Sequence, residues 1–249
     1  MPAAAELPTA AAPIAALTAT AFLLTESSSQ VLALTPVVVA EVTTTMGRMP
    51  PAPPPSPRRL GVVLAAGAGR RFGGPKILAA DGAWLRGAIA ALAVGGCDAV
   101  AVCMGAAKVP PPDGVIAVPV PDWSEGMSAS TRAALDLALD LEVDQVMLHL
   151  VDLPDVGPEI VARVAGRAGA GTAALARAAY NGHVGHPVLL GRDHFAAMRA
   201  TLTGDAGGRA YLAAAPQLLL VECGDLAGGR DIDCMPESGD GHIAQRPGV

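Results

Sequence analysis

The sequence predicts an α/β domain whose doubly wound, Rossmann-like and mostly parallel sheet is flanked by helices. Two observations favour this class. Apolar runs of strand length alternate with segments of helical spacing, as parallel strands require because they need crossover connections. In addition, a glycine-rich loop at residues 67–74 follows the first apolar run, and Asp152 follows the fourth. Ligands bind at the carboxyl ends of the strands in such sheets, so we expect the loop and the carboxylate to meet at one cleft.

The predicted elements follow in order along the chain. Strands are expected at residues 60–66, 99–104, 115–120, 145–151, 171–178, 186–190 and 217–222. Helices are expected at residues 84–94, 124–141, 158–167, 193–201 and 208–214. Gly95 and Gly96 end the first helix, and the second helix opens at Ser124 or Glu125.

The two ends of the chain differ in composition from its central part. Residues 1–58 are rich in Ala, Thr and Pro, and no positive charge precedes their apolar runs, which argues against a secretory signal. Those runs are interrupted before they reach the ~20 residues of a membrane span. Two alternatives remain for this region, a translation start at Met46 or Met49 and a membrane-associating tail. We expect a poorly ordered tail at 1–58, a folded domain at 59–236 and a flexible tail at 237–249.

Composition narrows the class of partner. Only 3% of the residues are aromatic, too few for a stacking platform that binds single-stranded nucleic acid. The net charge of −6 also opposes binding to nucleic acid or to an anionic membrane. The four cysteines form no C-x-x-C pair and are interpreted as reduced core thiols: Cys97, Cys103, Cys223 and Cys234. We therefore expect a cytoplasmic protein with no nucleic-acid or membrane partner.

The glycine loop carries the clearest chemical information. Its glycines leave backbone N–H groups uncovered, and three cations share the stretch: Arg70, Arg71 and Lys76. Uncovered amides together with Arg and Lys suit a triphosphate. A dinucleotide fingerprint fails because Phe72 takes the third glycine position, and a P-loop fails because Ile77 has no hydroxyl for magnesium. An ordinary glycine turn remains the alternative.

The same stretch resembles the motif L-A-A-G-x-S-x-R-M-G-x-x-K of the MobA-like nucleotidyltransferases. Seven residues match the motif: Leu64, Ala65, Ala66, Gly67, Arg71, Gly73 and Lys76. Gly69 replaces its serine and Phe72 its methionine. Further elements resemble the family in the same order: W-x-x-G-M-x-x-S at 123–130, D-x-P at 152–154, G-x-x-G-H-P at 182–187, G-D-x-G-x-R at 204–209 and D-I-D at 231–233. The last is broken, because Cys234 stands where the family has threonine.

The resemblance covers residues 60–236 and implies a fold of the nucleotide-diphospho-sugar transferase type. The nucleotide-binding residues that it implies are Leu64, Ala65, Ala66, Gly67, Ala68, Gly69, Gly73, Lys76, Gly126, Ser128 and Ser130. The implied catalytic residues are Arg71, Lys76 and Asp152. Asp152 and Asp233 would bind Mg²⁺, and His186 and Arg209 would bind the second substrate. A carboxylate directly after a buried strand is also placed to bind a hard cation, independently of the resemblance.

Several of these polar side chains have a structural alternative. Asp155 and Asp205 suit the capping of the helices that follow them, and Ser124 or Ser128 suits the same role. His186 would then be a hydrogen-bonded structural histidine. His149 lies inside an apolar strand and is interpreted as a core histidine whose hydrogen bonds are satisfied.

Within the family, Ala66 in L-A-A-G and the G-H-P element look most like the molybdenum cofactor cytidylyltransferases of the MocA type. The implied reaction joins CTP to the terminal phosphate of molybdopterin and releases pyrophosphate. The implied partners are a nucleoside triphosphate, a phosphorylated small-molecule acceptor and molybdenum hydroxylase enzymes. Two other functions remain, transfer to a sugar phosphate or another phosphorylated metabolite, and a non-catalytic carrier or insertion chaperone for the molybdenum cofactor.

Overall fold

The computed structural model describes residues 56–234, and the predictions for residues 1–55 and 235–249 lie outside this range. Its seven strands form one sheet: β1 Arg59–Leu64, β2 Ala99–Met104, β3 Val115–Pro119, β4 Gln145–Leu150, β5 Leu175–Tyr180, β6 His183–Gly191 and β7 Leu219–Glu222. Five α-helices join them: α1 Ala83–Val94, α2 Met127–Asp140, α3 Pro158–Ala168, α4 Phe195–Thr201 and α5 Arg209–Ala214. Short 3₁₀ turns lie at Lys76–Gly82, Trp123–Glu125, Arg192–His194 and Gly204–Ala206.

The strand order across the sheet is β3-β2-β1-β4-β6-β5-β7, with β1 next to the centre. Neighbouring strands run parallel except at β6, which is antiparallel to both β4 and β5. Because β6 is reversed, its first residues lie at the edge where β1, β4 and β5 end. The mostly parallel, doubly wound fold class is therefore confirmed, and the reversed strand brings His186 to the predicted binding edge.

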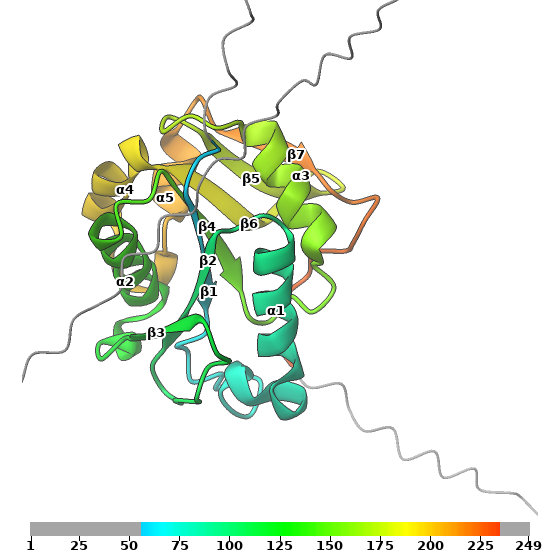
Figure 1. The fold of residues 1–249 in the computed structure, drawn as a ribbon. Helices are drawn as coiled ribbons and strands as arrows, with labels where there is room; N and C mark the ends of the chain where they lie inside the picture. Colours follow the sequence, from blue (N-terminus) through cyan, green and yellow to red (C-terminus); the bar gives the residue numbers. More distant parts are fainter. Residues whose placement is uncertain (1–55, 235–249) are drawn as a thin grey trace, which may run out of the picture. The chain divides into compact units, whose positions relative to one another are not determined.

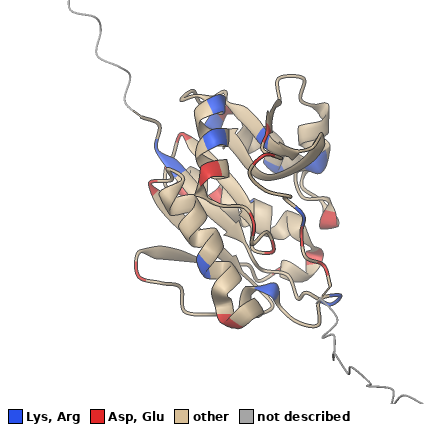
Figure 2. Cartoon of the chain, turned by 90° about the vertical axis from the view of Figure 1, so that its right-hand side faces the viewer, with Lys and Arg blue, Asp and Glu red and all other residues tan. Residues whose placement is uncertain are grey.

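Helices cover both faces of the sheet (Figure 1). Helices α1 and α3 pack on one face, where the buried core contains their side chains together with those of β1, β2 and β4. Helices α2, α4 and α5 pack on the other face in a second core. The cores are almost wholly aliphatic, as the low aromatic content predicts. Charged residues are sparse on the ribbon (Figure 2). A charged side chain that is partly buried therefore stands out as a candidate functional residue.

Two predicted elements differ from the structure for local reasons. The helix expected at 124–141 is a 3₁₀ turn followed by α2, because Gly126 has φ 107° and ψ −164°, which no helical residue adopts. The strand expected at 171–178 begins only at Leu175, since Gly171 accepts a turn hydrogen bond from Ala174.

One described stretch, Lys76–Val94, has the length and the mean hydropathy of 1.5 that a membrane-crossing helix needs. It is not a continuous helix, because Ala80 and Asp81 have positive φ values of 48° and 52°. Its regular part is α1, which is 12 residues long and buries one face, including Leu92, against the sheet. The stretch is therefore a turn followed by a core helix.

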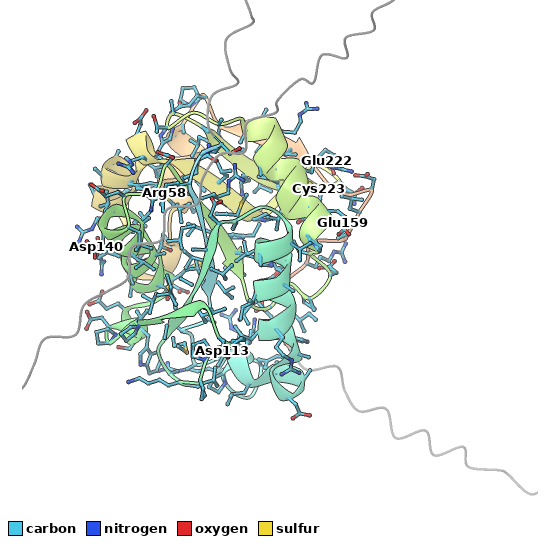
Figure 3. The ribbon with its side chains drawn as sticks, in the orientation of Figure 1. Arg58, Asp113, Asp140, Glu159, Glu222 and Cys223 are labelled. Carbon is cyan, nitrogen blue, oxygen red and sulfur yellow. The ribbon has the colours of Figure 1, made fainter. Side chains whose placement is uncertain are left out.

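Polar contacts fix the edges of the domain. The Arg58 N–H donates to Asp144 Oδ2 at 2.9 Å, which joins the chain before β1 to the chain before β4. At the end of β7, the Glu222 carboxylate accepts from the N–H groups of Asn181, Gly182 and Gly224 (Figure 3 labels Arg58 and Glu222). These bonds hold the β5–β6 turn against β7, beside the edge that carries the candidate site.

Candidate active site

The glycine loop (residues 67–74) winds around one carbonyl oxygen. The carbonyl of Gly69 accepts hydrogen bonds from the N–H groups of Phe72, Gly73 and Gly74 at 2.9, 3.0 and 3.1 Å. Gly69 has φ +58°, and a Cβ there would lie 1.9 Å from the Gly74 oxygen, so this position requires glycine. Within residues 56–234, the N–H groups of Gly67 and Ala68 make no backbone hydrogen bond, which leaves them available to an anion.

Lys76 lies where the glycine loop meets the end of β4. Its Nζ is 2.7 Å from Asp152 Oδ2 and 2.9 Å from Asp233 Oδ1, and only 15% of its side chain is exposed. Burial lowers the pKa of this ammonium, but hydrogen bonds and attraction from the two carboxylates outweigh burial and raise the pKa above its usual 10.5. The Asp233 carboxyl has a lowered pKa, mainly through the hydrogen bond from Lys76. Lys76 is therefore a held, fully charged cation at neutral pH.

Three carboxylates gather around this lysine. One oxygen each of Asp152, Asp231 and Asp233 lies within 4.8 Å of the others. Asp152 Oδ1 is buried and has no hydrogen-bond partner in the described part of the chain. The carboxylates outnumber the ammonium that they hold, so a divalent cation would neutralise excess negative charge in this cluster. Oxygen ligands suit a hard cation, so the residues present fit such an ion.

The closing segment (residues 226–233) carries Asp231 and Asp233 into the site. Its Ile232 N–H donates to the Asp152 carbonyl at 3.2 Å. The Asp155 carboxylate accepts from the N–H groups of Gly228 and Gly229 at 2.9 and 3.0 Å. The prediction that Asp155 caps the next helix is wrong, because α3 follows Gly157 without a side-chain cap. Asp155 instead fastens a segment more than seventy residues away.

The start of α2 forms the other wall of the site. Asp205 Oδ1 accepts from the Met127 N–H at 3.1 Å, so its carboxylate lies at the amino end of α2, where the helix dipole favours negative charge. The prediction that Asp205 caps the helix after it is therefore wrong, since α5 follows Gly208 with no side-chain cap. A Cβ on Gly126 would lie 2.8 Å from the Asp205 Cα, so glycine is needed for this close approach.

Two cavities meet along the glycine loop and form one cleft, here called the loop cleft. One measures about 410 Å³ and lies between the loop and residues Trp123–Ser130. The other measures about 560 Å³ and lies between the loop and the carboxylate cluster. Leu64, Gly67, Gly69, Arg70, Met127 and Asp205 line both. A chain of backbone amides with a cation and a carboxylate cluster at one end suits a nucleoside triphosphate with a divalent ion.

The family assignment agrees with this geometry. The MobA-like NTP transferase domain matches residues 61–218, which include the loop, Lys76, Asp152 and the start of α2. The chain belongs to this family. The resemblance in the sequence is thereby confirmed, and the family is one of nucleotidyltransferases that act on nucleoside triphosphates and phosphorylated acceptors.

Individual relatives extend the comparison. Nicotine blue oxidoreductase of Paenarthrobacter nicotinovorans is 34% identical over 198 residues, which are 71% of this chain and 93% of that protein. The crystal structure of a homologue of Mycobacterium tuberculosis Rv0371c, from Mycobacterium sp. strain JC1, is 28% identical with a TM-score of 0.58 and covers 71% of this chain and 91% of that one. Rv0371c itself, in complex with manganese, is 28% identical with a TM-score of 0.50 over 67% of this chain and 89% of its own.

Most of the residues expected from the MobA-like pattern line the loop cleft: Leu64, Ala65, Ala66, Gly67, Ala68, Gly69, Arg71, Lys76, Gly126, Ser130, Asp152 and Asp233. Two do not line it. The Gly73 N–H is used inside the loop, and Ser128 is fully buried with its hydroxyl unpartnered in the described residues. Ser128 is also not a cap, because α2 begins after Gly126 with no side-chain hydrogen bond.

The two residues expected to bind the second substrate lie together in a smaller cavity. His186 and Arg209 line a pocket of about 70 Å³ beside the loop cleft. Burial, followed by the positive charge of Arg177, lowers the pKa of His186 to about 3, so its ring is neutral at physiological pH. The His186 carbonyl accepts a hydrogen bond from the Tyr180 hydroxyl at 2.6 Å, which fixes the backbone at this point.

Three residues of the site were not among the site residues that the resemblance implied. Asp231 belongs to the carboxylate cluster, and its i, i+2 spacing from Asp233 was the available signal, because alternate residues of an extended segment share a face. Arg70 lines both parts of the loop cleft, although only Arg71 matched the family motif. Arg177 lines the small pocket with His186, and no motif marks it.

His149 does not have the satisfied hydrogen bonds that were expected of it. It is fully buried in β4, and neither ring nitrogen has a hydrogen-bond partner within the described residues. Burial lowers its pKa to about 4, although the nearby Asp155 charge opposes the shift. His149 is a neutral core residue that lines none of the three cavities described above.

Proposed function

We propose that this chain transfers the cytidylyl group of CTP to the terminal phosphate of molybdopterin and releases pyrophosphate. The carrying observation is Lys76, held between Asp152 and Asp233 at the point where the glycine loop meets the carboxylate cluster. In the reaction, an oxygen of the acceptor phosphate forms a bond to the α-phosphorus, and the bond from that phosphorus to the β-phosphate oxygen breaks. The attacking phosphate is already ionised, so no general base is needed.

The loop cleft supplies the positioning that such a transfer requires. The uncovered N–H groups of Gly67 and Ala68, with the exposed cations Arg70 and Arg71, bind the triphosphate. Lys76 is a compact charge that can follow the phosphate oxygens as negative charge develops on the leaving pyrophosphate.

The opposite wall of the cleft suits the uncharged part of the nucleotide. Asp205 and Glu125 add negative charge there, which disfavours phosphates and favours base amino groups and ribose hydroxyls as hydrogen-bond donors. The base and ribose therefore belong beside Gly126 and Ser130. The choice of CTP rests on Ala66 and the G-H-P element, by which the sequence resembles the cytidylyltransferases.

Mg²⁺ is the proposed metal. Asp152, Asp231 and Asp233 would hold it. Asp152 Oδ1 is buried and accepts no hydrogen bond from the described residues, so this oxygen is available as a metal ligand. When bound, Mg²⁺ would supply Lewis-acid stabilisation of phosphate charge. The manganese in the related Rv0371c structure supports a divalent ion in this fold. The change at Cys234 follows both closing carboxylates, so it leaves the ligand set whole.

Pyrophosphate release tests the proposal. The full chain is incubated with Mg²⁺, each of the four nucleoside triphosphates and either molybdopterin or a panel of sugar phosphates. The expected result is release that requires CTP and molybdopterin together. Release with a sugar phosphate alone would establish the alternative acceptor, and tight molybdopterin binding with no release would establish the carrier function. In cells, the proposed products are handed to molybdenum hydroxylases, which a pull-down of the loaded chain would detect.

A second candidate comes from one relative. Nicotine blue oxidoreductase is 34% identical along 93% of its length, which favours oxidoreduction of nicotine blue as the competing activity. Incubation of the full chain with nicotine blue and NADH or NADPH separates the two, because bleaching without any pyrophosphate release would replace the nucleotidyl transfer proposed here.

A further inference from the structure

The pocket that contains His186, here called the arginine pocket, differs in charge from the rest of the site. It has a volume of about 70 Å³ and lies between the ends of β4, β5 and β6 and helices α2, α4 and α5. Leu64 and Met127 line it and also line both parts of the loop cleft, so it opens beside the nucleotide site. Its polar lining includes Arg177 and Arg209, and none of its described lining residues is acidic.

Both arginines carry unmatched charge. Within residues 56–234, Arg177 and Arg209 form no ion pair, whereas Arg163 and Arg199 are paired with Asp225 and Asp136. Arg177 Nε donates to the Gly185 carbonyl at 2.9 Å, which fixes its guanidinium plane. The other guanidinium N–H groups of Arg177 have no partner among the described residues. A partly buried, oriented guanidinium with free N–H groups is arranged to bind an oxyanion.

The electrostatics of the pocket agree with this arrangement. Burial and the nearby charge of Arg209 both lower the pKa of Arg177, yet arginine stays protonated in proteins. The two cations therefore repel each other across a small volume, and an anion between them would remove that repulsion. His186 is neutral beside them, so it adds a hydrogen-bonding ring without adding charge.

We propose that Arg177 and Arg209, with the ring of His186, bind a phosphate monoester group of the acceptor, so that Arg177 is a specificity-determining residue. The proposal deepens the nucleotidyl transfer proposed above and rests on it. The two guanidinium groups carry two positive charges, which match the two negative charges of a phosphate dianion better than they match the one charge of a carboxylate. The small volume admits a compact group and excludes a base or a fused ring, which leaves the body of the acceptor in the wider cleft.

A direct binding experiment tests the pocket without any turnover. Inorganic phosphate is titrated into the ¹⁵N-labelled full chain while the Nε–Hε resonance of Arg177, identified with Arg177→Lys, is followed by NMR. The resonance should shift and saturate with phosphate, and it should not shift with chloride at equal ionic strength. Arg209→Gln should weaken this binding by about 10-fold or more, as expected for one charged hydrogen bond. The matched control Arg199→Gln, whose charge is paired with Asp136, should leave it unchanged.

Turnover gives the second readout. Arg177→Gln should raise the KM for the acceptor by about 10-fold or more and leave the KM for CTP unchanged, and Arg177→Lys should restore part of the loss. If Arg177→Gln lowers the melting temperature, Arg209→Gln is used in its place. Arg209 is exposed, so its replacement should leave the fold intact. An unmoved Arg177 resonance, or an unchanged acceptor KM in both variants of an active chain, overturns the proposal. A wild-type chain that releases no pyrophosphate overturns the proposed function instead, while the phosphate titration still decides the pocket.

Discussion

The loop cleft and the arginine pocket lie side by side and are both suited to phosphate, yet they handle charge in opposite ways. In the loop cleft the cation Lys76 is held by carboxylates, and the cluster as a whole is negative. In the arginine pocket the cations have no acidic partner among the described residues. The carboxylate cluster needs a divalent ion before it attracts phosphate, whereas the arginine pocket attracts an oxyanion directly. The predictions below test this division, beginning with the largest effect.

Removing a carboxylate from the cluster should have the largest effect. Asp152→Asn should lower Mg²⁺-dependent turnover by about 10³-fold, the upper range for losing one electrostatic contact at a reacting phosphate. The melting temperature should hold, because the amide keeps the size of the side chain. Steady-state pyrophosphate release and calorimetric titration with Mn²⁺ measure both consequences. Asp113→Asn, in an exposed turn before β3, is the matched control. Near-normal turnover at ordinary Mg²⁺ would show that Asp152 is not a ligand.

Removing the held cation should cost less. Lys76→Ala should lower turnover by roughly 10²-fold, while CTP affinity falls less because the loop amides and Arg71 remain. Lys76→Arg should recover little, since a planar guanidinium does not replace a compact ammonium held between two carboxylates.

The only other lysine in the chain provides the control for this prediction. Lys108 lies in an exposed loop, so Lys108→Ala should change neither turnover nor CTP affinity. CTP titration and turnover at saturation decide the role of Lys76. Weakened CTP binding with unchanged saturated turnover would mean that Lys76 only anchors the nucleotide.

Loosening the closing segment should have a smaller effect again. Asp155→Ala removes the acceptor for the Gly228 and Gly229 N–H groups, so Asp231 and Asp233 lose part of their positioning. We expect about a 10-fold loss of Mn²⁺ affinity, the scale measured for groups that orient metal ligands. Asp225→Ala, which removes the partner of Arg163 on the outer surface, is the control. Equal losses in the two variants would point to general destabilisation.

The smallest effect on activity and a distinct effect on stability are expected at His149. Its folded pKa of about 4 lies below the ordinary 6.5, so the unfolded chain takes up the proton first. His149 should therefore contribute a loss of stability as the pH drops from 6.5 towards 4, of about 2 kcal/mol between pH 7.5 and 5. His149→Leu should flatten this slope, leaving a part that comes from His186. Urea unfolding at the two pH values measures it, and an unchanged slope would contradict the assignment.

The sequence was sufficient for the order of the elements but not for all of their directions. Apolar runs of strand length predicted every strand of the sheet, because a strand that is buried between helix layers needs a continuous run of apolar residues. The reversal of β6 was not predictable in this way, since strand periodicity is the same in either direction. Gly126 was visible as a residue, but its positive φ accompanies the close approach of Asp205 from another part of the chain, which the sequence does not show.

The site divides along the same line. Residues that follow a strand directly, such as Gly67 and Asp152, were predictable because strand ends define the binding edge. Asp155 and Asp205 were misjudged because a capping rule considers only neighbours in sequence, and both carboxylates are used by backbone N–H groups far along the chain. Arg177 is a single cation in an apolar strand, and only the pairing of β5 with β6 brings it to His186.

The closing segment also sets the order in which the protein is completed. Asp231 and Asp233 follow β7, so the ribosome makes them after every strand and helix of the sheet, and about eighty residues after Asp152. Closing so long a loop costs conformational entropy, and its contacts can form only after the sheet has folded, so it is a late step of folding. A nascent chain that ends at β7 contains all the strands of the sheet but neither Asp231 nor Asp233, so the sheet can fold before the carboxylate cluster is complete.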